Sequence, residues 1–348
     1  MKRTRFAKLS ALIALLALAV IMLGAYVRLS NAGLGCPDWP GCYGRIIPPS
    51  ELQHDAFANQ RPLEPAKAWK EMIHRYLAGS LGVGILIITL LAWRNRRFGL
   101  PVLLPSLLLA LVIFQALLGM WTVTLKVHPA IVTTHLAGGL STLALLWWLT
   151  LRQGRWLAGD NSLVGLRKWT WIGLALLCGQ ILLGGWTSSN YAALACPDFP
   201  TCYSGLWWPA AEFDEGFTLW RELGVDYEFG ILNSGGRTAI HLTHRAGALL
   251  LLLYLGTLGA LVWRSARHPS HRRGAMLLLG ALLLQISLGI SNVIWQLPLP
   301  LAVAHNGGAA LLLLAMISLI HAMSPVAQKQ AQTQTTRLNS VQGIGDAA

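Results

Sequence analysis

Long apolar runs separated by short polar connections dominate the chain. Six runs of about twenty residues carry few or no charges, and a helix needs about that length to cross a bilayer: Leu9–Val27, Tyr76–Trp93, Phe98–Leu125, Val127–Leu151, Trp169–Ala195 and Ala246–Trp263. The stretch Gly274–Gln328 contains no Asp, Glu, Lys or Arg and has room for two more crossings, with Pro298 and Pro300 marking the turn. The pattern predicts an all-α membrane protein with eight transmembrane helices.

Composition agrees with this pattern and excludes other classes. Of the 348 residues 54% are hydrophobic and only 12% are charged, whereas a soluble domain carries roughly a quarter of its residues as charges. The net charge of +13 is scattered in short clusters between the apolar runs. A nucleic-acid-binding protein would gather such charges into one patch, so no nucleic-acid partner is expected.

The distribution of charge predicts the orientation of the helices. Lys and Arg cluster before the first span and after the second, fourth and sixth, whereas 12 of the 14 acidic residues fall in the other connections. Because basic connections face the cytoplasm, both termini are predicted to be cytoplasmic. The polar segment 324–348 is predicted to be a disordered cytoplasmic tail.

The chain contains two copies of one unit. Cys36-Pro-Asp-Trp-Pro-Gly-Cys42 recurs as Cys196-Pro-Asp-Phe-Pro-Thr-Cys202, and Gln115-Ala-Leu-Leu-Gly119 recurs as Gln285-Ile-Ser-Leu-Gly289. The repeat predicts two tandem four-helix bundles, 1–155 and 156–323, related by a pseudo-twofold axis along the membrane normal. It also argues against interpreting the first span as a cleaved signal peptide or a lipoprotein anchor, because the matching segment lies inside the chain.

Four histidines lie at matched positions in these halves. His74 and His135 are 61 residues apart, and so are His244 and His305, each near the predicted outer end of an even-numbered span. A pair of imidazoles from two helices of one bundle is typical of six-coordinate heme. Zinc is the weaker alternative, because two histidines per half leave its tetrahedral coordination incomplete. The histidines beside the connections (His54, His128, His268, His271 and His321) are expected to be solvated.

The residues next to the histidines distinguish the two halves. Glu71 precedes His74 by three positions, where the second half has His241 before His244. A carboxylate and an imidazole on one helix face suggest a proton acceptor beside a catalytic site, and a helix-start acid favoured by the dipole is the alternative. Arg75 and Arg245 follow the histidines and are candidates for pairing with heme propionates or for snorkelling to the interface.

The four loop cysteines form two Cys-x5-Cys pairs in predicted outer loops. Disulfides Cys36–Cys42 and Cys196–Cys202 are the structural interpretation, in an oxidising compartment. A redox-active pair that exchanges with a partner thiol is the functional alternative. Cys178 stands alone in the fifth span and is expected to pack as a small hydrophobic residue.

Together, Glu71-x-x-His74-Arg75, Thr134-His135, His244-Arg245 and His305, with the paired cysteines, resemble the heme A synthase family over roughly residues 10–323. The resemblance implies an enzyme that oxidises the C8 methyl group of heme O to a formyl group by successive hydroxylations, giving heme A for cytochrome oxidase. It implies that His74 and His135 bind heme O beside the catalytic Glu71. It also implies that His244 and His305 ligate the iron of a permanent heme b.

The resemblance places the chain in a bacterial inner membrane, with the heme sites near the periplasmic face. Its candidate partners are membrane lipid, heme O synthase and cytochrome oxidase assembly factors, and it leaves the oligomeric state open. Two other functions are consistent with the residues alone. One is a diheme b-type electron carrier linked to quinone, and the other is a periplasmic-facing disulfide-relay protein.

Overall fold

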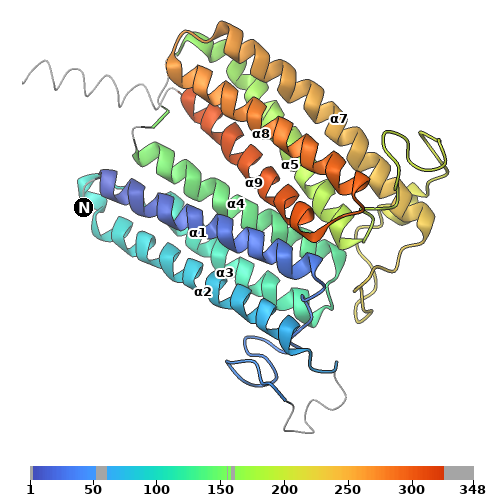
Figure 1. Cartoon of the computed structure of the whole chain (residues 1–348). Helices are drawn as coiled ribbons and strands as arrows, with labels where there is room; N and C mark the ends of the chain where they lie inside the picture. The colour runs from blue at the N-terminus through green and yellow to red at the C-terminus, as the bar shows by residue number, and fades with distance from the viewer. Residues whose placement is uncertain (1–2, 52–60, 155, 158–160, 325–348) are drawn as a thin grey trace, which may run out of the picture.

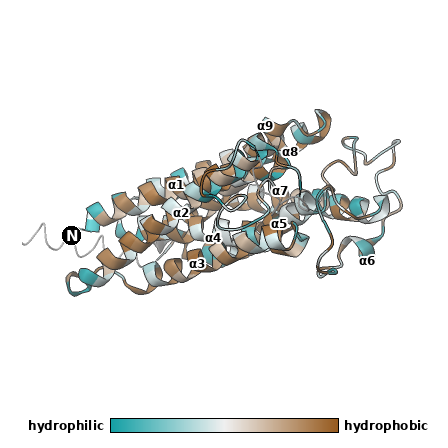
Figure 2. Cartoon of the chain, turned by 90° about the horizontal axis from the view of Figure 1, so that it is seen from below, coloured by the Kyte–Doolittle hydropathy of each residue, from teal (hydrophilic) through white to brown (hydrophobic). Residues whose placement is uncertain are grey.

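The computed structural model describes residues 3–51, 61–154, 156–157 and 161–324 (Figure 1). Its helices are α1 (Arg3–Leu29), α2 (Pro65–Arg94), η2 (Arg96–Phe98), α3 (Leu103–Thr124), α4 (Pro129–Gln153), η3 (Asn161–Leu166), α5 (Arg167–Ser189), α6 (Phe213–Gly216), α7 (Ser234–Ser265), α8 (Pro269–Ile294) and α9 (Leu299–Ala322). Within this described part, eight helices are long and apolar enough to cross a membrane, which confirms the predicted all-helical membrane class. Figure 2 shows that hydrophobic residues dominate these helices. The predicted tail 324–348 lies outside the described residues apart from Ser324.

Two helices begin well before the apolar runs from which they were predicted. Helix α2 starts at Pro65 rather than Tyr76, and α7 starts at Ser234 rather than Ala246. Proline is favourable in a first helical turn, where its missing N–H would have no partner, and the Asn233 side chain accepts a hydrogen bond from the Gly236 N–H at 2.7 Å. A search for apolar runs cannot detect these first turns, because they are polar. As a result His74 and His244 lie inside their helices, about two and a half turns from the start.

The long helices form two rings of four. In the first ring α1 contacts α2, α2 contacts α3, α3 contacts α4, and α4 returns to α1. Helices α5, α7, α8 and α9 close the second ring in the same order, and the two groups lie side by side in Figure 1. The rings meet through α1 with α9, α4 with α5, and α4 with α9. A twofold axis that relates α1 to α5 and α4 to α9 would exchange the α1–α9 and α4–α5 contacts and leave the α4–α9 contact in place. The observed contacts support such an axis. The twofold relation and the domain boundaries both stay predictions.

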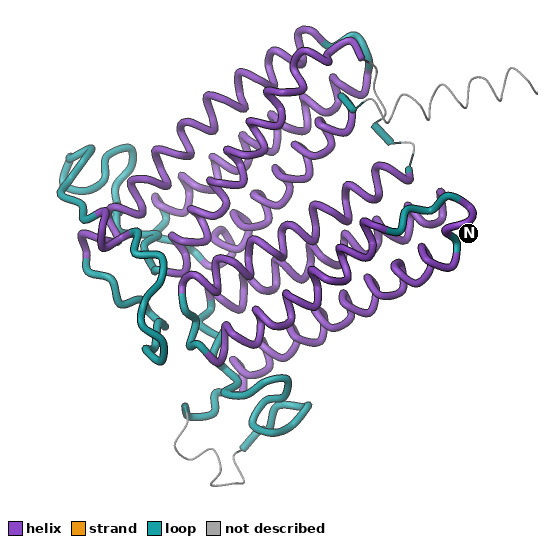
Figure 3. The backbone as a smooth tube through the Cα atoms, turned by 180° about the vertical axis from the view of Figure 1, so that it is seen from behind, coloured by secondary structure: helices purple, strands orange, loops and turns teal. Residues whose placement is uncertain are grey.

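The connections gather at two ends of the bundle. The loops that contain the paired cysteines lie at one end, which we call the disulfide end, and the opposite end, where α1 begins, is the terminal end (Figure 3). At the terminal end Arg3 donates to the backbone oxygen of Gly99 at 3.1 Å, so the start of α1 is joined to the connection between α2 and α3. Helix α9 contacts helices of both rings and is the most buried of the membrane-spanning helices.

At the disulfide end, a loop of the second half covers the turn between α3 and α4. The Tyr227 N–H donates to the Lys126 backbone oxygen at 3.2 Å, and Lys126 Nζ donates to the Gly224 oxygen at 3.0 Å. Arg61, from the first half, pairs with Asp226 and Glu228. These contacts tie the long second loop to the first ring.

The expectation that His128 is solvated is wrong. It lies under this loop with 1% of its surface exposed, its ring 4.7 Å from that of Trp220 and 5.0 Å from that of Tyr227. His271 and His321 are also buried, at the terminal end, where His271 Nε2 lies 3.1 Å from the Ala322 oxygen. All three were expected in solvent because they flank connections, but the long loop covers His128, α9 contacts His271, and the Trp148 ring of α4 packs against His321.

Burial of His128 predicts a pH-dependent loop contact. Burial lowers the pKa of His128 below its usual 6.5, and the positive charge of Arg221 acts in the same direction against the hydrogen bond to the Arg221 oxygen. A histidine whose pKa falls on folding stabilises the contact above pH 6.5, and this stability is lost as the pH falls toward its folded value. Asp226 stays ionised at pH 5, because hydrogen bonds from Glu228 and Arg61 outweigh burial and lower its pKa.

We therefore expect the Tyr227 amide to exchange hydrogen faster at pH 5 than at pH 7.5, after correction for the intrinsic rate. His128→Gln should remove this difference. The Gly230 amide, which bonds to Tyr227 within the same loop, reports whether the loop unfolds as a whole. Equal corrected rates at Tyr227 at both pH values would contradict the prediction.

Candidate functional site

A large cavity in the first ring contains the first pair of matched histidines. It has a volume of about 1180 Å³ and is lined by residues of α1, α2, α3 and α4, among them Glu71, His74 and His135. His74 and His135 are half-buried and near enough for their charges to interact. The cavity exceeds the roughly 300–1,000 Å³ of typical small-molecule pockets, so it can take a large ligand.

Each of the four histidine rings packs against a glycine of a neighbouring helix. A Cβ atom at Gly24 would lie 2.9 Å from His74 Cε1, one at Gly184 3.2 Å from His244 Cε1, and one at Gly289 3.1 Å from His305 Cε1. At Gly119 the corresponding distance to His135 is 3.5 Å, an ordinary contact. The missing side chains let the helices approach closely enough to hold each ring from one side.

The imidazole nitrogens of these histidines fit a ligand that is coordinated by two imidazoles. The Nδ1 atoms of His74, His135 and His305 are buried and find no hydrogen-bond partner in the described part of the chain, which is costly unless a ligand or water completes them. Among the described residues, His, Cys, Asp and Glu side chains form no group of three or more that could hold a metal ion. Two imidazoles from alternate helices are the axial ligand set of a six-coordinate heme, so the residues present fit that group.

Glutamine side chains lie within hydrogen-bond distance of both rings of the second pair of histidines. His244 on α7 and His305 on α9 are half-buried and near enough for their charges to interact. The side-chain amide of Gln180 lies 3.1 Å from His244 Nδ1 and donates to the His244 backbone oxygen at 2.9 Å. The amide of Gln285 lies 3.2 Å from His305 Nε2. The two histidine sites are therefore built differently.

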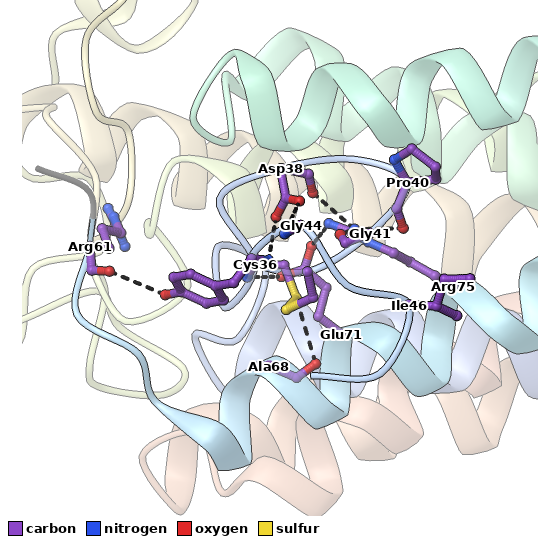
Figure 4. Close-up of a disulfide and its surroundings, with 12 residues drawn as sticks. Cys36, Asp38, Pro40, Gly41, Gly44, Ile46, Arg61, Ala68, Glu71 and Arg75 are labelled. Atoms are coloured by element: carbon purple, nitrogen blue, oxygen red, sulfur yellow. Dashed lines mark hydrogen bonds and ion pairs between the residues drawn. A yellow bond between two sulfur atoms is a disulfide. The ribbon is translucent and has the colours of Figure 1, made fainter. Parts of the chain in front are cut away.

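Glu71 joins the first histidine helix to its disulfide loop (Figure 4). The carboxylate is 4% exposed, accepts the Cys36 N–H at 2.9 Å and pairs with Arg75 at 2.5 Å. Arg75 also donates to the backbone oxygens of Asp38, Pro40 and Gly41 in the loop. Glu71 lines the cavity one helical turn from His74, so a carboxylate lies beside the first pair.

In the second half, His241 takes the place of Glu71. Its Nδ1 accepts the Cys196 N–H at 3.0 Å, as Glu71 accepts that of Cys36. Arg245 donates to the oxygens of Thr201, Cys196 and Asp198, as Arg75 does in its own loop. His241 therefore anchors a loop, a role that its sequence spacing did not reveal. The contacts of Arg75 and Arg245 are with loop carbonyls, and pairing with propionates stays a prediction.

Both predicted disulfides are present and buried. Cys36 is bonded to Cys42 and Cys196 to Cys202, and all four cysteines are at most 1% exposed. The Asp38 carboxylate accepts the N–H groups of Tyr43 and Gly44 at 2.6 and 2.8 Å, which holds the turn after Cys42. Buried sulfur is poorly placed for exchange with a partner thiol, so the geometry favours a structural role over a disulfide relay. Cys178, expected to pack as a small hydrophobic residue, is exposed on the surface of α5.

Two site residues were missed by sequence reasoning. Arg28 lines the cavity and crosses to the second ring, donating to the Tyr191 hydroxyl at 2.7 Å and to the Ser188 oxygen at 3.1 Å. An arginine that ends an apolar run looks like an ordinary interfacial charge, so the sequence offered no signal for this role. Gln180 did offer one, because Gln180-Ile-Leu-Leu-Gly184 repeats the spacing of Gln115-Ala-Leu-Leu-Gly119.

Comparison with known proteins gives one consistent result. Residues 7–317 match the COX15-CtaA family, described as cytochrome oxidase assembly protein. A heme A synthase of Shewanella oneidensis is 46% identical over 308 residues, which cover 87% of this chain and 92% of the relative. Heme A synthases of Halalkalibacterium halodurans (28% identical, 70% of this chain and 71% of the relative) and Allorhizobium ampelinum (27% identical, 87% and 86%) also match. With the family matched over nearly its whole length, this chain belongs to the COX15-CtaA family of cytochrome oxidase assembly proteins.

Proposed function

We propose that this protein is a heme A synthase, a multi-pass membrane oxidoreductase that converts heme O to heme A by oxidising the C8 methyl group to a formyl group. Family membership and the 46% identity to the Shewanella oneidensis enzyme support the assignment. The main structural support for the assignment is the cavity of about 1180 Å³, which is lined by two imidazoles and one carboxylate. In the described part of the chain the carboxylate lies beside the first histidine pair and His241 takes its place beside the second, so we assign heme O to His74 and His135.

The shape of the cavity suits a substrate that arrives from the bilayer. Val83 and Leu86 of α2 and Ile113 of α3 line it and are also exposed on the helix surface, at 57%, 41% and 57%. The cavity therefore reaches the lipid-facing side between α2 and α3. The farnesyl tail of heme O can remain there in hydrocarbon, since moving it into water would cost about 0.8 kcal/mol per methylene.

Glu71 is placed to accept a proton released from the methyl group. Arg75 and the Cys36 N–H each engage one carboxylate oxygen, and each oxygen keeps a further lone pair for a proton. Arg75 can keep its three loop carbonyls when Glu71 is protonated, so its charge stays partnered. Glu71 can therefore accept a proton while Arg75 still holds the disulfide loop in place.

The second pair is assigned to a resident heme b. His244 and His305 would provide its two axial ligands, and the heme would supply a one-electron redox centre next to the substrate site. We also propose a bacterial inner membrane as its location, and the alternating basic connections support an orientation with cytoplasmic termini and the disulfide end toward the periplasm.

The assignment is tested by deleting the gene and profiling the membrane hemes. We expect heme O to accumulate while heme A disappears, and a plasmid copy of the gene should restore heme A. Unchanged heme A in the deletion strain would contradict the proposal. Purified protein that carries heme B alone at both sites would indicate the electron carrier instead.

Glu71→Gln should abolish most of the activity without disturbing the fold. The amide oxygen can still accept the Cys36 N–H, but the side chain no longer takes a proton readily, so heme A formation should fall by about 10²- to 10⁴-fold. The low-spin heme b spectrum should remain near normal. His305→Ala is the converse control, since it should remove most of that absorbance. Normal heme A output from Glu71→Gln would rule out the proton-acceptor role.

Gly82→Leu should block the cavity. Gly82 lines it, and a Cβ atom there meets no other atom within 4 Å, so the helix itself tolerates the new side chain. A loss of about 1.4 kcal/mol in heme O binding would raise the KM about tenfold. Gly256→Leu on α7 is the matched control, because its Cβ also meets open space but Gly256 does not line this cavity. Equal KM values for the two variants would contradict the assignment of the cavity to heme O.

A further inference from the structure

Arg28 is a charged residue of the first cavity that the proposed function has not used. It lies in the last turn of α1, and its half-buried side chain lines the cavity. Nη1 donates to the Tyr191 hydroxyl at 2.7 Å, and Nη2 donates to the backbone oxygens of Ser188 and Ser189 at 3.1 and 3.4 Å. The guanidinium also lies over the Tyr191 ring, 4.3 Å from its centroid. All of these partners are neutral.

The Arg28 guanidinium pairs with no carboxylate among the described residues. Its Nε is buried and finds no hydrogen-bond partner in the described part of the chain. The other charged side chains of the described chain that line the cavity, Glu71 and Arg75, pair with each other. Arg28 therefore leaves the cavity with one positive charge in excess, and a charge taken out of water is costly unless it is paired. A ligand that brings a carboxylate would complete the site.

Arg28 and Glu71 lie at the same level of the bundle. Helix α1 runs toward the disulfide end, and Arg28 follows Gly24, which contacts the His74 ring, by four residues or about 6 Å. Helix α2 runs the opposite way, and Glu71 precedes His74 by three residues or about 4.5 Å. Both side chains thus lie about one turn beyond the first imidazole, toward the disulfide end, on helices that contact each other.

The repeat shows that the end of this helix does not by itself require an arginine. Gly24 and Gly184, the glycines under His74 and His244, are matched positions of the two halves. In the same register Arg28 corresponds to Ser188, whose backbone oxygen Arg28 itself bonds. The arginine is therefore a feature of the first half, where the assigned ligand is the substrate.

We propose that Arg28 binds a propionate carboxylate of heme O and turns the C8 methyl group toward Glu71. The inference rests on the proposed function and deepens it. In heme O the C8 methyl group is attached to the same pyrrole ring as one of the two propionates, so one edge of the macrocycle carries both an anion and the reacting carbon. With that propionate at Arg28, this edge faces the disulfide end, at the level where Glu71 lies. Arg28 supplies the orientation and Glu71 the proton acceptor.

The test compares two ligands in a spectral titration of full-length protein that contains its resident heme b, in detergent and without reductant. One ligand is ferric heme O, and the other is its dimethyl ester, which has the same macrocycle and tail but no propionate charge. We expect the ratio of the ester Kd to the free-acid Kd to fall about 10- to 100-fold in Arg28→Gln, as the loss of a charge-assisted hydrogen bond should cause. Arg28→Lys should retain part of the wild-type ratio. The comparison of ratios cancels any difference between the two ligands in partitioning into detergent.

Lys70→Gln is the matched control. Lys70 lies on α2 near the disulfide end, with its Nζ 5.0 Å from the centroid of the Tyr26 ring, and it does not line the cavity. This variant removes the same charge from the same end of the protein and should leave the ratio unchanged. A purely structural role of Arg28 between the two rings would weaken both ligands equally, so the Arg28→Gln ratio would also stay at the wild-type value.

A second measurement tests the orientation. At saturating heme O, Arg28→Gln should form heme A at least about tenfold more slowly, because a substrate that is free to turn presents its C8 methyl group to Glu71 less often. The midpoint potential of heme b should stay at the wild-type value.

Equal ratios in Arg28→Gln and the wild type would overturn the proposal, as would a shifted heme b potential with unchanged heme O binding. The titration needs no turnover, so a protein that makes heme A and shows equal ratios would refute this inference alone. A fall of the ratio in a protein whose deletion leaves heme A unchanged would support Arg28 as a site for heme carboxylates and refute the proposed function.

Discussion

The close approach of each histidine ring to a glycine on the adjacent helix is the contact on which the site depends. At Gly24, Gly184 and Gly289 even a single Cβ atom would press on the ring. In the proposed assignment two rings of one bundle bind the same ligand from different helices, so the spacing of those helices sets the spacing of the imidazoles. The glycines therefore belong to the site as much as the histidines do.

A second constraint keeps the disulfide loops above the histidines. Glu71 and His241, different in chemistry, accept the same kind of backbone N–H from the first cysteine of each loop. Arg75 and Arg245 then bond to the loop carbonyls. Each loop is thus fastened to the turn that precedes its histidine. Because Glu71 also lines the cavity, the carboxylate that anchors the first loop is also available as a proton acceptor.

The two halves differ in the polar groups around their histidines. The first has the carboxylate and a large cavity, and Nδ1 of both its imidazoles finds no hydrogen-bond partner among the described residues. The second has glutamine amides against both imidazoles. Buried polar contacts count strongly in a water-poor interior, so a few changed side chains give the histidines of two similar bundles different surroundings.

The sequence by itself determined the eight helices, the repeat and the four histidines, because membrane spans need long apolar runs and duplication leaves fixed spacings. It missed the polar starts of α2 and α7, the burial of His128, and the anchoring role of His241. It also could not tell that Arg28 crosses between the rings or that Gln180 touches His244. These features depend on which side chains meet across helices, and only tertiary packing decides that, since spacing along one chain says nothing about the partner that a buried polar atom finds.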